Sequence, residues 1–235
     1  MSSIGLFPIL VCDYDYPDHD AFKKTFFSNI EKYITPFDGG TQDESGTVVL
    51  HLNKELQPFY TFVATCAKDY VKELGVDPSE WAYHLVKSWW NANEKSNIPE
   101  HDHSDAHISF VYYLNAPPQS NKLVFMPQHY HPNDLTNGLF QDNYAGETTI
   151  LNRNQYNSSP AFDALEGNLI IFPGRLKHAT ISMTSPMEVD DTTRDPKILK
   201  QRRISISGDF LMTFKDPNNR RSLGLQPMAN WIRFV

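Results

Sequence analysis

The sequence predicts a mainly β protein whose N-terminal part is helical. Two observations support this fold class. Before about residue 80, apolar residues recur at helical spacing. After it, the chain consists of short runs of β-branched and aromatic residues, separated by Pro, Asn and Gly. Several short strands at such intervals are typical of a β-sandwich or barrel.

The N-terminal part contains two amphipathic segments. Over residues 18–34, apolar residues recur every four positions, which places them on one face of a helix. A second helix is expected over 52–74, broken at Pro58 and ended by Gly75. We expect a short apolar strand before both helices, at about 6–12.

The second part contains seven runs with the composition of strands. They are 82–93, 107–115, 121–127, 147–152, 168–173, 178–183 and 203–214. The polar stretch 185–201 lies between two of these strands. We expect it to form a long loop, either a lid over a pocket or a plain insertion.

Length and composition predict one compact domain. With 235 residues and an apolar share of 40%, the chain is long enough to bury its own core. Within that domain we expect residues 1–80 to pack on a core formed by residues 81–214. Residues 215–235 are expected to form a C-terminal extension.

The charge pattern and the cysteines exclude several classes of protein. A net charge of -7 without a basic run argues against nucleic acid as a partner. Cys12 and Cys66 follow neither a disulfide nor a thiolate metal pattern. Because no apolar run reaches the roughly 18 residues of a membrane span, we expect a soluble, cytoplasmic protein.

The stretch HDHSDAHISFVYYL, residues 101–114, places metal-competent side chains directly before an apolar strand. Alternate residues of a strand share a face, so the odd-numbered and even-numbered side chains should point to opposite sides. The even-numbered apolar residues 108–114 can then pack under the helices. The odd-numbered ones, beginning with His101, His103 and Asp105, are left to line the interior of the sandwich.

Two histidines that are two residues apart on a strand supply adjacent metal ligands, and a third ligand must come from elsewhere. His178 begins the run 178–183 and is the only histidine in the second half of the β region. Buried imidazoles need partners, and a metal ion is a suitable one.

The run RISIS places Arg203 and Ser205 on one strand face. An inward-facing Arg is costly unless it meets an anion, and its forked guanidinium suits a carboxylate. Ser205 can add a hydroxyl donor beside it. Alternatively, Arg203 pairs with an acidic residue such as Asp209 or Glu166. Arg202 should point outward.

Four motifs in this order resemble a known family. SWWNAN (88–93), the histidine stretch (101–114), NLIIFPGRLKH (168–178) and RISIS (203–207) together resemble the iron(II)- and 2-oxoglutarate-dependent oxygenases. They are most similar to a small branch with S-W-x-N, H-x-H, S-G-V-Y-Y-L, L-x-x-F-P-x-x-x-x-H and R-I-S-I-S. The resemblance spans about residues 81–214 and implies a double-stranded β-helix, or jelly-roll, core.

The resemblance also implies a metal centre. By this comparison His101, His103 and His178 hold Fe(II). In the wider superfamily the middle ligand is commonly a carboxylate, which gives two His and one Asp or Glu. The set His103, Asp105 and His178 is therefore a second possibility, and the sequence leaves both open. A second H-x-H pair, His129 and His131, lies in a Pro- and Asn-rich loop and better suits solvent exposure or substrate contact.

The same resemblance implies that Arg203, with Ser205, binds the distal carboxylate of 2-oxoglutarate. Tyr113 faces the same side as the expected ligands and can donate its hydroxyl to this cosubstrate, or serve as a core residue. Trp89 and Asn91 also share a face. A packing role suits Trp89, and a hydrogen bond to substrate or cosubstrate suits Asn91. Where the branch has a small Gly, this chain has Phe110.

The activity implied is that of an Fe(II)- and 2-oxoglutarate-dependent dioxygenase, which hydroxylates a substrate and releases succinate and CO2. Two alternatives remain. One is a cupin-like dioxygenase with an all-His iron site and no cosubstrate, in which Arg203 binds the substrate's own carboxylate. The other is a non-catalytic jelly-roll binding protein. The sequence indicates neither the substrate, a small molecule or a peptide, nor the oligomeric state.

Overall fold

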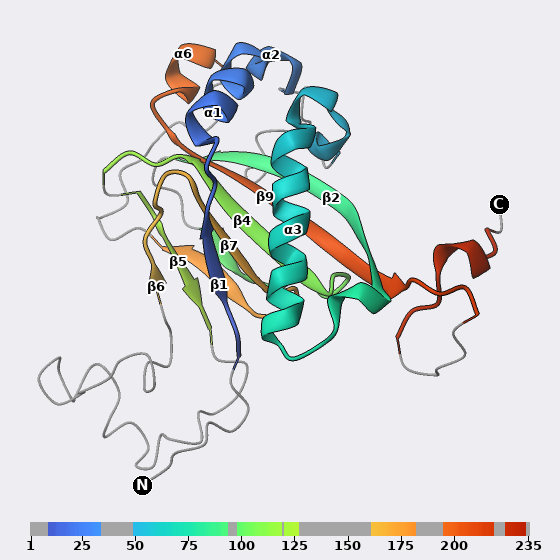
Figure 1. Cartoon of the computed structure of the whole chain (residues 1–235). Helices are drawn as coiled ribbons and strands as arrows, with labels where there is room; N and C mark the ends of the chain where they lie inside the picture. The colour runs from blue at the N-terminus through green and yellow to red at the C-terminus, as the bar shows by residue number, and fades with distance from the viewer. Residues whose placement is uncertain are drawn as a thin grey trace, which may run out of the picture.

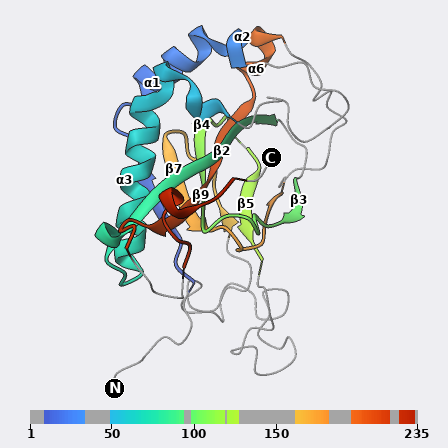
Figure 2. The ribbon, with the colours of Figure 1, turned by 90° about the vertical axis from the view of Figure 1, so that its right-hand side faces the viewer.

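The fold is two antiparallel β-sheets packed face to face, with N-terminal helices on the outer face of the larger sheet (Figures 1 and 2). The computed structural model describes residues 9–33, 49–93, 98–118, 120–126, 161–181, 195–218 and 224–233. The expected fold class, mainly β with N-terminal helices around a double-stranded β-helix core, is confirmed.

Nine strands in the described residues form the two sheets. The larger sheet has the order β1 (Cys12–Asp15), β7 (Asn168–Pro173), β4 (Ile108–Asn115), β9 (Arg203–Phe214), β2 (Trp81–Asn93). The smaller sheet has the order β3 (Ile98–His101), β8 (His178–Ile181), β5 (Lys122–Phe125), β6 (Ala161–Phe162).

Six of the seven expected strand runs form strands, and the seventh, 147–152, lies outside the described residues. The expected first strand at 6–12 is wrong in position, because the strand present is β1, Cys12–Asp15. β3 and β6 were not expected. Both are short edge strands of the smaller sheet, too short or too polar to show an alternating pattern.

The helices differ from expectation in their boundaries. Instead of one helix over 18–34, the chain forms α1 (His19–Ser28) and α2 (Ile30–Tyr33), separated at Asn29. At Asn29 the backbone N–H donates to the carbonyl of Phe26, and the side-chain amide donates to the carbonyl of Thr25.

The second helix, α3 (Gln57–Glu73), begins later than expected. Pro58 lies in its first turn, where a missing N–H costs no hydrogen bond, so it starts the helix instead of breaking it. Gly75 ends it with φ 79°, as expected for a left-handed residue after a helix. The remaining helices among the described residues are η1 (Leu50–Leu52), η2 (Lys54–Leu56), η3 (Pro78–Glu80), α6 (Pro196–Leu199) and η4 (Met228–Asn230). None of the described helices is both long and apolar enough to cross a membrane.

The two faces of the larger sheet contribute to two separate apolar clusters. On the helix side, residues of α1 and α3 pack against the even-numbered side chains of β4, which are Ile108, Phe110, Tyr112 and Leu114. Between the sheets, Val111 and Tyr113 of β4 pack with residues of β5 and β7. The alternation expected along residues 108–114 is therefore confirmed, and the odd-numbered side chains face the interior between the sheets.

The ring of Phe110 fills space that is available because the facing residue on the neighbouring strand is a glycine. Phe110 lies opposite Gly208 in the register of β4 and β9. A Cβ at position 208 would lie 2.6 Å from Cε1 of Phe110 and 2.8 Å from the carbonyl oxygen of Lys87. The large residue at 110 is therefore matched by the absence of a side chain on the neighbouring strand.

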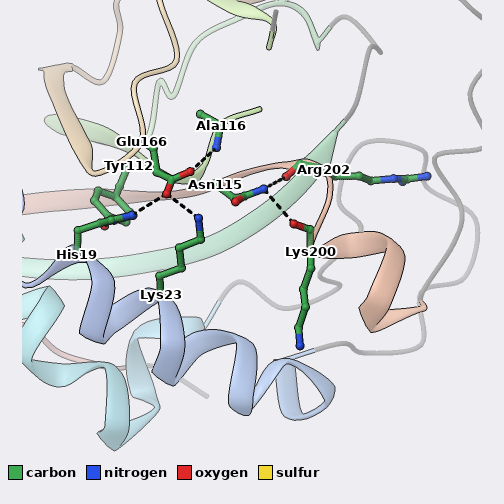
Figure 3. Close-up of polar contacts among 8 residues, drawn as sticks. All are labelled: His19, Lys23, Tyr112, Asn115, Ala116, Glu166, Lys200 and Arg202. Atoms are coloured by element: carbon green, nitrogen blue, oxygen red, sulfur yellow. Dashed lines mark hydrogen bonds and ion pairs between the residues drawn. The ribbon is translucent and has the colours of Figure 1, made fainter. Parts of the chain in front are cut away.

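A polar network fastens α1 to the larger sheet (Figure 3). Glu166, before β7, accepts hydrogen bonds from Lys23 (2.6 Å), His19 (3.1 Å) and the backbone N–H of Ala116 (3.2 Å). The other ring nitrogen of His19 lies 2.6 Å from the hydroxyl of Tyr112. Burial alone would raise the pKa of Glu166, but the bonds from Lys23 and His19 outweigh it and lower that pKa.

The stretch expected as a loop or lid, 185–201, lies mostly outside the described residues. Its described end forms α6, and Leu199 is buried in the helix-side cluster. The ammonium of Lys200 lies 5.8 Å from the centre of the Phe27 ring. This end of the stretch is therefore docked beside α1.

Candidate metal centre

Residues 101–108 connect the two sheets, so the strand alternation that was expected to extend back to His101, His103 and Asp105 does not hold there. β3 ends at His101 in the smaller sheet, the chain turns, and β4 begins at Ile108 in the larger sheet. The backbone N–H of His103 donates to the carbonyl of Gly174 at 2.8 Å. A Cβ at position 174 would lie 2.6 Å from the carbonyl oxygen of Ala106, so this close approach requires glycine.

The structure brings together three of the expected ligands. One ligand atom from each of His101, His103 and His178 lies within 4.8 Å of the others, and this group can hold a metal ion. His101 and His178 are direct partners in the register of β3 and β8, with ring centroids 4.4 Å apart. The ring of His103 lies 5.4 Å from that of His101 and 5.1 Å from that of His178.

Backbone hydrogen bonds orient two of the three rings. Nδ1 of His101 lies 2.8 Å from the carbonyl oxygen of Pro99, and Nδ1 of His178 lies 2.8 Å from that of Leu176. Because a carbonyl oxygen only accepts, both rings carry their proton on Nδ1. Each therefore keeps the lone pair of Nε2 for a metal ion.

The ring of His103 is held by a carboxylate. Its Nδ1 lies 2.6 Å from Oδ1 of Asp209, which is fully buried. Ser109 donates to the same oxygen at 2.7 Å, and the ammonium of Lys87 lies 3.3 Å from Oδ2. With Nδ1 bound to Asp209, His103 also offers Nε2, so the cluster consists of three nitrogen donors.

This donor set fits a transition metal. The pKa of His178 is lowered to about 4, chiefly by burial and also by the neighbouring His101 and His103, against the opposing effect of the bond to Leu176. His178 is consequently neutral near pH 7, as a metal ligand must be. Imidazoles suit Fe, Zn, Cu and Ni, so the donor chemistry alone does not select among these ions.

Asp105, the alternative ligand, lies outside the cluster. Its side chain is 66% exposed and forms an ion pair with Lys87 at 2.8 Å. The carboxylate nearest the three histidines in the described structure is instead that of Asp209, which contacts His103 directly. The second H-x-H pair, at 129 and 131, lies outside the described residues.

Arg203 is 2% exposed and carries donors that nothing in the described structure satisfies. Its Nε and Nη1 lack a hydrogen-bond partner among the described residues, as does the hydroxyl of Tyr113. The guanidinium carbon lies 5.1 Å from the centre of the Tyr113 ring. The two acidic partners considered for Arg203 are engaged elsewhere, Asp209 with His103 and Glu166 with α1.

The remaining expected cosubstrate residues form a row beside Arg203. Ser205 is the register partner of Asn91 on β2 and of Tyr113 on β4, so the three side chains share one face of the larger sheet. All three are buried. Along β9, Ser205 lies two same-face positions from Asp209, or about 13 Å between Cα atoms at strand spacing. The row of Asn91, Ser205 and Tyr113 and the histidine cluster therefore both lie between the two sheets, but at different positions along β9.

Arg202 does not point outward as expected, because it is 3% exposed. It precedes β9, so strand alternation does not apply to it. Its carbonyl oxygen accepts a hydrogen bond from the side-chain amide of Asn115 at 2.6 Å, and the carbonyl of Lys200 accepts from the same amide at 3.2 Å (Figure 3).

Sequence reasoning missed the role of Asp209, which it considered only as a partner for Arg203. A signal was present, because Asp209 shares the inward face of β9 with Arg203 and Ser205. It also missed that the Trp89 ring lies 5.5 Å from the His103 ring, which places this aromatic side chain at the metal cluster.

Comparison with known families supports the resemblance found in the motifs. The model of a family described as "Putative 2OG-Fe(II) oxygenase" matches residues 87–188. This segment contains all three clustered histidines and ends before Arg203. The chain thus resembles the 2-oxoglutarate- and Fe(II)-dependent oxygenases, as its motifs predicted. No curated protein matches the chain.

Several solved structures align with this chain at low sequence identity. A Burkholderia pseudomallei oxidoreductase of the 2OG-Fe(II) oxygenase family is 14% identical over 55% of this chain, with a TM-score of 0.33. The chain spans only 43% of that protein. A Pseudomonas putida prolyl-4-hydroxylase is 10% identical, with 85% of this chain and 86% of that one covered and a TM-score of 0.45.

A third structure aligns with a TM-score of 0.50. It is a prolyl hydroxylase from Trichoplax adhaerens in complex with a hypoxia inducible factor peptide, 9% identical, with 85% of this chain and 82% of that one covered. At such identity the likeness concerns the fold alone.

Proposed function

We propose that the protein is an Fe(II)- and 2-oxoglutarate-dependent dioxygenase that hydroxylates a small molecule or a peptide. The main observation behind this proposal is that two features lie together in the space between the two sheets. Three imidazoles converge with Nε2 available, and a buried guanidinium retains unsatisfied donors. The match of residues 87–188 to an oxygenase family supports the same reading.

In this proposal His101, His103 and His178 hold Fe(II). Three protein ligands leave further coordination positions for a cosubstrate and O2. When bound, iron and 2-oxoglutarate would supply an O2-dependent oxidation of the substrate, with succinate and CO2 as coproducts.

Arg203 and Ser205 bind the distal carboxylate of 2-oxoglutarate in this proposal. Leaving a buried guanidinium without an anion is costly, and a carboxylate satisfies two of its N–H groups at once. Tyr113 has a buried hydroxyl without a partner among the described residues and can donate to the same cosubstrate. Asn91, in the same row, can add a further hydrogen bond.

Aromatic side chains pack against the histidine cluster in this interior. The ring of His178 lies 4.9 Å from that of Phe172 and 6.2 Å from that of Phe125. Both phenylalanines are buried in the cluster between the sheets that also contains Tyr113. Exclusion of water strengthens the electrostatic attraction between Arg203 and a bound carboxylate. We also propose the cytoplasm as the site of action, because Cys12 and Cys66 are both free thiols.

The test is 2-oxoglutarate turnover by purified protein with Fe(II), O2 and ascorbate, with succinate measured by mass spectrometry. We expect iron-dependent succinate formation, slow in the absence of the prime substrate, and none from His178→Ala. Iron binding without any binding of 2-oxoglutarate would instead indicate a cosubstrate-free, cupin-like dioxygenase. Binding of neither would indicate a jelly-roll protein without turnover.

A further inference from the structure

We propose that Asp209 is a positioning residue of the metal centre, which holds the ring of His103 with Nε2 toward the metal and supplies a negative charge through that ring. The inference rests on the proposed metal site. It concerns a residue outside the ligand set and outside the matched family segment, which ends at residue 188.

The position of Asp209 on β9 is set by its two neighbouring strands, β2 and β4. In the register of the larger sheet, its direct partners are Lys87 on β2 and Ser109 on β4. Both contact its carboxylate, Ser109 at Oδ1 and Lys87 at Oδ2. Asp209 is thus a fully buried carboxylate held at a defined place on a rigid sheet.

The backbone alone does not orient the ring of His103. This residue lies in the segment that crosses between the sheets, and its N–H and C=O bind the backbone of Gly174 and Ala106. These bonds set the position of the Cα atom but leave the ring free to rotate. The ring is set at Nδ1, which lies 2.6 Å from Oδ1 of Asp209 and 3.1 Å from the hydroxyl oxygen of Ser109. Of these two partners, Asp209 is the closer and the one that carries a charge.

Asp209 differs from the partners of the other two histidines. His101 and His178 donate to backbone carbonyl oxygens, which carry no net charge. A carboxylate behind an imidazole fixes its tautomer and raises the basicity of the ligating nitrogen. In a site of three imidazoles, Asp209 therefore supplies some of the negative charge that a carboxylate ligand would otherwise bring.

Lys87 links this carboxylate to the surface. Its ammonium lies 3.3 Å from Asp209 and 2.8 Å from the exposed Asp105. Asp105 is the outer member of this series of ion pairs and does not itself contact the histidines. Lys87 offsets part of the charge of Asp209 without occupying the oxygen that His103 uses.

The experiment measures Zn(II) affinity and the His103 tautomer in the full-length protein. Zn(II) serves as a redox-inert probe, and its affinity is read by competition with a chelating dye. The tautomer is read from long-range ¹H–¹⁵N spectra of the metal-free protein, with the signal of residue 103 assigned by His103→Ala. The variant is Asp209→Asn, which keeps the shape and removes the charge.

Glu166→Gln is the matched control. It removes the charge from another carboxylate that contacts a histidine, His19, on the helix side of the sheet. Ser109→Ala is a second, milder variant. It removes a donor to Asp209 and the hydroxyl 3.1 Å from Nδ1 of His103, but it leaves the carboxylate in place. Thermal melting of each metal-free variant shows whether it is folded.

We expect the wild type to carry the His103 proton on Nδ1. Asp209→Asn should weaken Zn(II) binding by about 10- to 100-fold, the usual effect of removing such an outer partner, and should lower the Nδ1–H population. Glu166→Gln and Ser109→Ala should keep the wild-type tautomer, and Glu166→Gln should keep Zn(II) affinity within about twofold.

Two results would overturn the proposed role of Asp209 but leave the metal site standing. One is a folded Asp209→Asn protein with wild-type Zn(II) affinity, and the other is an Nε2–H tautomer of His103 in the metal-free wild type. The second measurement needs no variant, so it decides the question even if Asp209→Asn does not fold. A wild type that binds no Zn(II) would overturn the metal site itself and this inference with it.

Discussion

Arg203 lies over the ring of Tyr113, with its guanidinium carbon 5.1 Å from the ring centre. Tyr113 is the register partner of Ser205, two residues along β9 from Arg203. The Arg203 side chain therefore extends along the strand toward Ser205, so its guanidinium lies closer to the histidine cluster than the Cα atom of Arg203 does. Burial raises the pKa of Tyr113, and the charge of Arg203 acts against it, so the phenol stays protonated and able to donate.

Replacing Arg203 by Ala should weaken 2-oxoglutarate binding at least thirtyfold. Loss of one partner of a buried charge pair costs on the order of 2 to 5 kcal/mol, and about 1.4 kcal/mol corresponds to a factor of ten. Lys should recover only part of the affinity, because it offers a point charge in place of a fork. The measurement is titration of the anaerobic Fe(II) protein, followed by the metal-to-ligand absorption band.

Iron affinity is the internal control for these variants, since Arg203 is not in the histidine cluster. It should change little in either variant. Equal 2-oxoglutarate affinities for the wild type, Arg203→Ala and Arg203→Lys would remove the main support for a cosubstrate at this row.

Replacing His178 by Ala should abolish tight metal binding. The ring is a direct neighbour of His101 and His103 in the cluster, and two remaining imidazoles bind a divalent ion far more weakly. His107→Ala is the control, because that histidine is exposed and its Nδ1 accepts from the backbone N–H of Met212. Metal content after dialysis, measured by mass spectrometry, distinguishes the two variants.

Replacing Asp105 by Ala should leave the metal bound, whereas replacing His101 should release it. The exposed carboxylate pairs with Lys87, while the His101 ring lies 4.4 Å from that of His178. The opposite result, retention in His101→Ala and loss in Asp105→Ala, would move the ligand set to His103, Asp105 and His178.

Replacing Gly208 by Ala should destabilise the fold by about 1 to 3 kcal/mol, the usual cost of overpacking a core. The added methyl would meet the Phe110 ring and the carbonyl oxygen of Lys87. Urea denaturation gives the free energy of unfolding. In the double variant Phe110→Leu/Gly208→Ala the loss should be smaller than the sum of the single losses, and strict additivity would contradict this packing.

Replacing Glu166 by Gln should lower stability at pH 7 and have no effect in acid. The folded-state pKa of Glu166 is lowered, so its contribution is present above its ordinary pKa of about 4.3 and is lost as pH falls below that value. Because the carboxylate is 36% exposed, we expect about 1 kcal/mol or less. Urea denaturation at pH 7 and pH 3 measures both states. An equal difference in unfolding free energy between the wild type and Glu166→Gln at pH 7 and pH 3 would show that the charge of Glu166 does not matter.

Much of the fold follows from local patterns in the sequence. The alternation along residues 108–114 assigns each side chain to one face of β4, because strand geometry requires it. Apolar spacing likewise predicts where α1 and α3 lie, and Gly75 marks the end of α3, although Pro58 starts that helix and was expected to break it. These features depend on neighbours within a few residues, so they can be read along the chain.

The residue types of the candidate site were also determined by sequence. His101, His103 and His178, with Arg203 and Ser205, stand out by chemistry and by their order along the chain. Their spacing could not decide between His101 and Asp105 as a neighbour of His178, because both readings assumed that one strand ran through residues 101–114.

Only the tertiary structure decided that question. The chain leaves the smaller sheet after His101 and enters the larger one at Ile108, so Asp105 is carried outward. Asp209 meets His103 across 106 residues of sequence, through a pairing of strands that no local pattern encodes. Contacts of this kind depend on which strands become neighbours, and the packing of the whole core determines that.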